Sequence, residues 1–140
     1  MSTSRLSKDQ AYAILRAATG FVMGPAGASG TRSSGEEALR TLLALPTAAT
    51  DVRRLLREAR IGGRLYALLG LRWLADDDFA AELEPYLAKQ EAVSTMHGCC
   101  VLSEPVSAIA ACISKGWYDD PEGWEGGDVR PQRRGRRSDA

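Results

Sequence analysis

One segment constrains the fold of this chain more than any other. In residues 61–74, IGGRLYALLGLRWL, apolar side chains surround nearly the whole circumference of a helix, and only Arg64 and Arg72 are charged. A helix that is apolar all round must be covered on several sides. The segment therefore predicts a central helix against which the rest of the chain packs, and its glycines would permit close approach of neighbouring helices.

Arg64 and Arg72 are the charged exceptions in this helix. At about 100° per residue they lie roughly 80° apart, so they share one flank. An arginine on a largely buried helix must reach solvent or an acidic group, because an unpaired charge is costly to bury. We therefore predict Arg64 and Arg72 as partner-binding residues.

Shorter amphipathic helices are predicted before this segment. Ser7 and Gln10 have the spacing of a capping box, in which each side chain bonds the other residue's backbone N–H. Ser34 and Glu37 repeat that spacing at the start of a second helix, and Pro46 ends it. In residues 51–60 an apolar stripe lies opposite a face that carries Asp51 and four arginines, which indicates a half-buried surface helix.

Two further helices are predicted after the central segment. Residues 75–90 open with three aspartates, which suit the positive end of a helix dipole, and Pro85 should kink or split this helix. A last helix should cover about residues 105–114, with Ser103 as its cap. Between them, residues 93–102 are ambiguous: they fit two short extended pieces joined by a turn at His97 and Gly98.

The predicted fold class is all-α. We expect about six short antiparallel helices, arranged as a compact bundle or as a HEAT-like array, within a domain of residues 1–115. Residues 116–140 are expected to form a tail, largely disordered, that is acidic first and then basic. Its aromatic residues Trp117, Tyr118 and Trp124 are expected to hold its first half on the domain.

Three runs carry a family resemblance: GRLYALLGLRWLADDDF, VSTMHGCCVLSEPVSAIAACI and SSGEEALRTLLALPTAATDVRRLLREA. Together they resemble a group of small uncharacterised bacterial proteins over roughly residues 12–114. The most specific motifs are LYALLGL and the pair Gly98–Cys99. The resemblance implies a shared fold and supplies no activity, so it transfers no functional residue.

The segment TMHGCC places the only histidine of the chain, His97, beside Cys99 and Cys100, with Cys112 the only other cysteine. These four residues are the candidate ligands for a metal. Adjacent side chains in an extended chain point to opposite faces, which opposes joint binding by Cys99 and Cys100. The chain has no C-x-x-C motif, which is the spacing typical of redox-active thiols. The simpler interpretation is that the cysteines pack as small hydrophobes, with Cys112 on the flank of the last helix.

Other catalytic patterns are incomplete. Gly30 and Gly35 have the spacing of a phosphate loop, but Glu36 and Glu37 stand where a lysine and a hydroxyl are required. The three aspartates at residues 76–78 are explained by the helix start. We therefore predict no catalytic residue and no cofactor, and an enzyme is the less favoured interpretation.

Charge gives one further alternative. The formal net charge is +0, so the whole molecule has no strong attraction for nucleic acid or anionic membrane. No apolar run is long enough to span a membrane and no signal peptide is recognisable, so we expect a cytoplasmic protein. The tail nevertheless offers a compact basic patch that could contact phosphates. Its residues are Arg130, Arg133, Arg134, Arg136 and Arg137.

These observations favour a helical protein–protein interaction or adaptor module without catalytic activity. An immunity or inhibitor protein for a toxin is a sub-case of this prediction. The first alternative is a nucleic-acid-associated protein that acts through the arginine-rich tail. The second is a thiol- or metal-dependent protein that uses Cys99 and His97.

Overall fold

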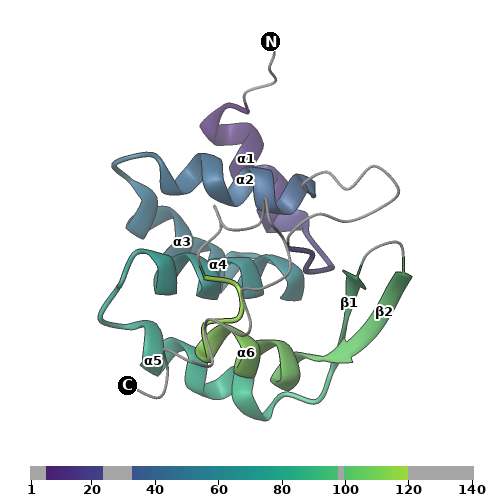
Figure 1. The fold of residues 1–140 in the computed structure, drawn as a ribbon. Helices are drawn as coiled ribbons and strands as arrows, with labels where there is room; N and C mark the ends of the chain where they lie inside the picture. The colour runs from purple at the N-terminus through teal and green to yellow at the C-terminus, as the bar shows by residue number, and fades with distance from the viewer. Residues whose placement is uncertain (1–5, 24–32, 98–99, 120–140) are drawn as a thin grey trace.

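The computed structural model of the chain describes residues 6–23, 33–97 and 100–119. Within these ranges it contains six α-helices, one short 3-10 helix and one two-stranded antiparallel sheet (Figure 1). The predicted number of helices is confirmed, but the all-α class is wrong in one respect, because residues 92–105 form a β-hairpin. In chain order the elements are α1 (Lys8–Ala17), α2 (Ser34–Leu43), α3 (Ala48–Glu58), α4 (Ile61–Trp73), α5 (Phe79–Leu83), η1 (Glu84–Ala88), β1 (Ala92–His97), β2 (Cys100–Pro105) and α6 (Val106–Ser114).

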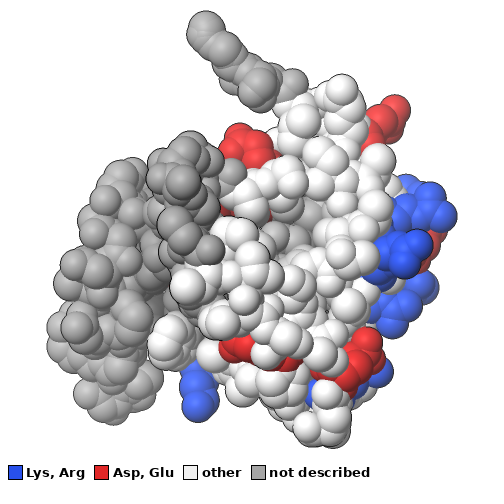
Figure 2. Space-filling view, turned by 90° about the vertical axis from the view of Figure 1, so that its right-hand side faces the viewer, with Lys and Arg blue, Asp and Glu red and all other residues white. Residues whose placement is uncertain are grey.

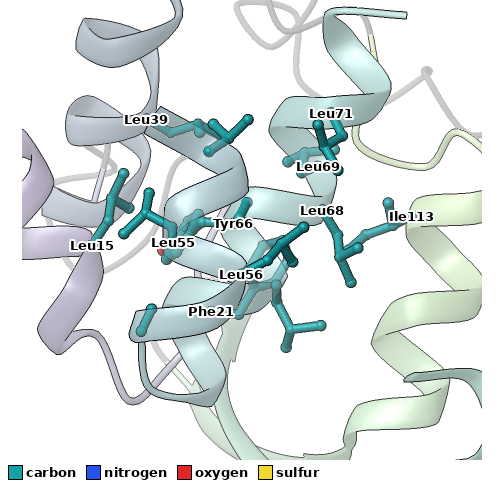
Figure 3. Packing of buried hydrophobic residues seen from close by; sticks show 14 of the residues in the cluster. Leu15, Phe21, Leu39, Leu55, Leu56, Tyr66, Leu68, Leu69, Leu71 and Ile113 are labelled. Atoms are coloured by element: carbon teal, nitrogen blue, oxygen red, sulfur yellow. The ribbon is translucent and has the colours of Figure 1, made fainter. Parts of the chain in front are cut away.

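Helix α4 is the centre of the molecule, as its sequence predicts. It packs against α1, α2, α3, α5, α6 and β1, and residues 65–71 are all buried. Figure 3 shows leucines of α1, α2 and α3 gathered on one side of α4, while Leu68 meets Ile113 of α6 on the other. Each fully buried leucine stabilises the fold by roughly 2 kcal/mol, so this helix organises most of the core.

The glycines at the start of α4 allow the backbone of α1 to rest directly on it. A Cβ at Gly63 would collide with the carbonyl group of Leu15, and one at Gly62 would collide with the backbone of Gly20. The N–H of Gly63 donates to the carbonyl oxygen of Ala18 at 3.1 Å. The predicted close approach is therefore confirmed.

The starts of α1 and α2 follow the sequence with one shift. Ser7 and Gln10 form the predicted capping box. At α2 the N-cap is Ser33, whose hydroxyl accepts from the N–H of Glu36, so the predicted box at Ser34 is wrong by one residue. The reason is tertiary, because the Ser33 hydroxyl also donates to the carbonyl oxygen of Val22 at 2.8 Å.

The charged face predicted for α3 needs one correction. Asp51 is only 2% exposed and lies at the buried side of the first turn. Its carboxylate accepts from the Thr47 hydroxyl at 2.9 Å and lies 3.7 Å from the ammonium group of Lys8. These partners compensate for the burial of the charge.

Pro85 splits its helix, as predicted: α5 ends at Leu83 and the chain continues as η1. The ambiguous segment that follows forms two extended strands, with Thr95 opposite Leu102 and His97 opposite Cys100. Residues 98–99 of the predicted turn lie outside the described residues. Ser103 lies in β2 and does not cap α6, whose N-cap is Pro105.

The first residues of the predicted tail belong to the domain. Gly116 adopts φ 84°, and the N–H of Trp117 returns to the carbonyl oxygen of Cys112 at 3.0 Å, which closes the end of α6. The chain then folds back, so that the ring of Tyr118 meets Phe21 edge-on at 5.2 Å. The predicted contact of Tyr118 with the domain is confirmed, whereas Trp124 lies outside the described residues.

Helix α4 ends with the same kind of turn as α6, but the left-handed position is occupied by alanine instead of glycine. Ala75 adopts φ 56°, in the left-handed region, and the N–H of Asp76 returns to the carbonyl oxygen of Leu71. A residue with a Cβ pays about 1–2 kcal/mol for this conformation, which glycine adopts freely.

We therefore expect Ala75→Gly to raise the free energy of unfolding by about 1 kcal/mol and Gly116→Ala to lower it by a similar amount. The two substitutions are matched, since each exchanges the same two residues at the same helical position. Denaturant unfolding measures both. If both substitutions changed the free energy of unfolding in the same direction, the left-handed conformation of Ala75 and Gly116 would be contradicted.

Candidate interaction surface

The predicted metal and thiol residues are only partly described. His97 ends β1 opposite Cys100 at the start of β2. The His97 side chain and Cys99 lie outside the described residues. Cys100 is exposed and Cys112 is half-buried, and neither forms a disulfide. Among the described residues no three His, Cys, Asp or Glu side chains are placed to hold a metal. A thiol or metal function therefore stays a prediction.

The two arginines predicted to bind a partner have different surroundings. The Arg72 guanidinium bonds the Asp119 carboxylate at 2.8 Å and the carbonyl oxygen of Ser114 at 3.1 Å, so its acidic contact belongs to this chain. The Arg64 Nε donates to the carbonyl oxygen of Ala59 at 2.9 Å, beside Arg60. Arg72 thus ties residue 119 to α4, whereas Arg64 adjoins a cluster of other arginines.

This cluster, which we call the arginine surface, comprises Arg16 at the end of α1, Arg54 and Arg57 on α3, and Arg60 between α3 and α4. All four are exposed. Figure 2 shows basic side chains gathered along one edge of the molecule, with few charges over the centre of that view. The N–H of Arg60 donates to the carbonyl oxygen of Arg16 at 3.1 Å, which joins α1 to the end of α3.

Three arginines elsewhere in the described chain are neutralised by nearby carboxylates. Their salt bridges are Arg40 to Glu36, Arg53 to Asp76 and Asp78, and Arg72 to Asp119, at 2.7–2.8 Å. On the arginine surface, only Arg54 has a carboxylate neighbour, Glu58, at 3.7 Å. Within the described ranges, Arg16, Arg57 and Arg60 have no acidic partner, so their charge is available to another molecule.

A shallow hollow lies within the arginine surface. Its volume is about 480 Å³, and it is lined by Ala13, Arg16, Ala17, Glu58 and Arg60. The two alanines leave room between the charged side chains. The hollow is therefore lined by two positive charges, one carboxylate and two small apolar side chains.

Tyr12 orients Glu58 at the edge of this hollow. The Tyr12 hydroxyl donates to the Glu58 carboxylate at 2.8 Å, and the Arg54 guanidinium lies over the Tyr12 ring at 4.7 Å. Burial, followed by the hydrogen bond to Glu58, raises the pKa of Tyr12 to about 12. The hydroxyl therefore remains protonated and able to donate to Glu58 at physiological pH.

This surface is not predicted by the sequence pattern, because the charged side of α3 has the composition of an ordinary solvated face. The available signal was the ratio of four arginines to two acids in residues 51–60. The contribution of Arg16 had no local signal, because only the packing of α1 on α4 brings it to Arg60.

Comparison with protein-family models, with curated proteins and with solved structures found no match. The resemblance based on LYALLGL and on Gly98–Cys99 therefore stays a prediction. The tail arginines predicted to bind nucleic acid, residues 130–137, lie outside the described residues. No helix in the described ranges is long and apolar enough to cross a membrane.

We expect Glu58→Gln to lower the pKa of Tyr12 from about 12, because the carboxylate raises it both as a hydrogen-bond acceptor and as a charge. Titration of tyrosinate absorbance in the folded protein measures the change, and Tyr12→Phe identifies which part of the signal belongs to this residue. An unchanged titration in the Gln variant would contradict the contact.

The two described cysteines should differ in reactivity. Burial raises the pKa of the Cys112 thiol, and the charge of Glu104 raises it further. Because the thiolate is the reactive form, Cys112 should be alkylated at least several-fold more slowly than Cys100. Variants with Cys99 and one other cysteine replaced by serine isolate each thiol, and the unfolded proteins provide the reference rate. Faster reaction at Cys112 would count against its burial.

Proposed function

We propose that this chain is a non-catalytic helical module that binds an acidic partner protein through the arginine surface. One observation carries the proposal: Arg16, Arg57 and Arg60 form no salt bridge within the described residues, whereas Arg40, Arg53 and Arg72 are all paired. Unneutralised arginines that share a surface attract acidic partners and accelerate encounter with them.

The mixed character of the hollow favours a protein over a nucleic acid as the partner. Glu58 lines the hollow together with Arg16 and Arg60 and would repel a phosphate backbone. A protein partner can place a carboxylate on the arginines and a donor on Glu58. The small side chains of Ala13 and Ala17 also leave space for an inserted side chain.

The proposed module is a compact bundle. The packing of five other helices and β1 around α4 supports a bundle over a HEAT-like array, in which each repeat contacts only its neighbours. An immunity or inhibitor protein would be one such module. Nucleic-acid binding through Arg130–Arg137 remains the alternative that the experiment must separate.

The test compares two variants of equal charge change. The first variant, Arg57→Glu with Arg60→Glu, replaces two positive charges of the arginine surface with negative ones. The control variant, Lys89→Glu with Lys115→Glu, makes the same change in charge outside that surface. After cross-linking in the native host, we expect an acidic protein to copurify with the wild type and with the lysine variant. Its affinity for the arginine variant should be at least about tenfold lower, because two attractions become repulsions.

Nuclease treatment of the cross-linked material distinguishes a protein partner from a nucleic acid. If nuclease releases the bound material, the partner is a nucleic acid and the alternative is correct. Equal binding by both double variants would show that the arginine surface is not the contact. Thermal unfolding of each variant establishes that a lost interaction is not lost folding.

A further inference from the structure

The hairpin offers a second surface, which shares no residue with the arginine surface. Strand β1 lies between β2 and the helical body, and β2 forms the outer edge of the sheet (Figure 1). Residues 100–103 of β2 are exposed, and Val101 and Leu102 are 65% and 43% exposed. A β-strand edge that carries apolar side chains readily pairs with another strand.

The hydrogen-bond pattern identifies the groups that are open on this edge. The carbonyl oxygen of Ser94 in β1 accepts from the N–H of Phe21 at 2.8 Å, so it points away from β2. In an antiparallel pair, the opposite residue then points its backbone groups away as well. That residue is Ser103, and Val101, two residues before it, shares its direction. The described part of the chain places no hydrogen-bond partner on the outward groups of either residue.

The other edge of the hairpin is already covered. Gly20 bridges Ser94 in parallel on that side, next to the bond from Phe21. Only β2 can therefore accept a further strand. At its far end Pro105 lacks an N–H, which limits the edge to residues 100–104.

We propose that β2 pairs antiparallel with β2 of a second copy of this chain, around a two-fold axis at Leu102. In this register Val101 of one copy faces Ser103 of the other, so the outward N–H and C=O groups of both residues are all paired. The two Leu102 side chains then lie directly opposite each other, with Cβ atoms about 4.5–5.5 Å apart. Two hairpins become one continuous four-stranded sheet.

The register shifted toward the end of β2 satisfies fewer groups. An axis at Ser103 would set Val101 opposite Pro105, which has no N–H to donate. The chosen register also avoids opposing like charges, because Glu104, the only charged residue of β2, faces Cys100 of the second copy. The strand is thus complementary to itself, as a two-fold interface requires.

The remaining segments of this chain are poorer occupants of the edge. Residues 24–32 and 120–140 are interrupted by glycine and proline, which are depleted in strands. Residues 1–5, MSTSR, equal the open edge in length but carry one apolar side chain, that of Met1. The sequence CVLSE of β2 itself is the segment with the composition of a strand.

Cysteine scanning tests the register in the full-length chain. In a background where Cys99, Cys100 and Cys112 are serine, Leu102→Cys should form a disulfide-linked dimer under mild oxidation, since the two side chains meet at the axis. Ser103→Cys is the matched control: its two copies lie diagonally, about 7–8 Å apart, and should remain largely unlinked. Equal cross-linking of the two variants would overturn the proposed register.

A second experiment tests the dimer without introducing a cysteine, by removing one hydrogen bond of the proposed pairing. Ser103→Pro deletes an outward N–H that β1 does not use, whereas Ser103→Ala retains it. Analytical ultracentrifugation should show a concentration-dependent dimer for wild type and Ser103→Ala, and an at least about tenfold higher dissociation constant for Ser103→Pro. A wild type that stays monomeric at its highest soluble concentration, or a dimer insensitive to Ser103→Pro, overturns the proposal. Neither result bears on the arginine surface.

Discussion

The direct contact between the backbones of α1 and α4 positions both surfaces of this molecule. At Gly63 no side chain separates the first turn of α4 from the carbonyl group of Leu15. This approach brings the end of α1 to the end of α3, where the N–H of Arg60 bonds the carbonyl oxygen of Arg16. The chain leaving α1 then supplies Phe21, whose N–H holds β1 through Ser94. One close approach therefore aligns the arginine surface and orients the hairpin.

Two groups of arginines in the described part of the chain differ in their surroundings. Arg53 and Arg72 bond carboxylates just beyond the ends of α4 and α6, where left-handed residues turn the chain back toward the domain. These pairs hold the segments that follow α4 and α6. Both pairs are partly buried, and each fixes the direction in which the chain leaves its helix. Within the described residues Arg16, Arg57 and Arg60 form no such salt bridge, and all three side chains are exposed.

The sequence predicted the helical part of the fold well, because its signals are local. The apolar circumference of α4, the capping box at Ser7 and the split at Pro85 each depend on residues within a few positions of one another. The hairpin was missed as an element of the fold class, since the stability of paired strands depends on contacts across the pair and with Phe21. The start of α2 was misplaced for a similar reason, a bond from Ser33 to Val22.

By itself, the sequence determined that α4 must be central and that the chain around it forms short helices. Helical periodicity and capping are properties of neighbouring residues, so they can be recognised without the fold. Only the tertiary structure decided that Arg53 and Arg72 are neutralised, because their pairs join residues 23 and 47 positions apart. It also decided which hairpin edge is open, since that depends on where the residues after α1 pass. Charge and hydrogen-bonding capacity become available to a partner only where folding has left them unpaired.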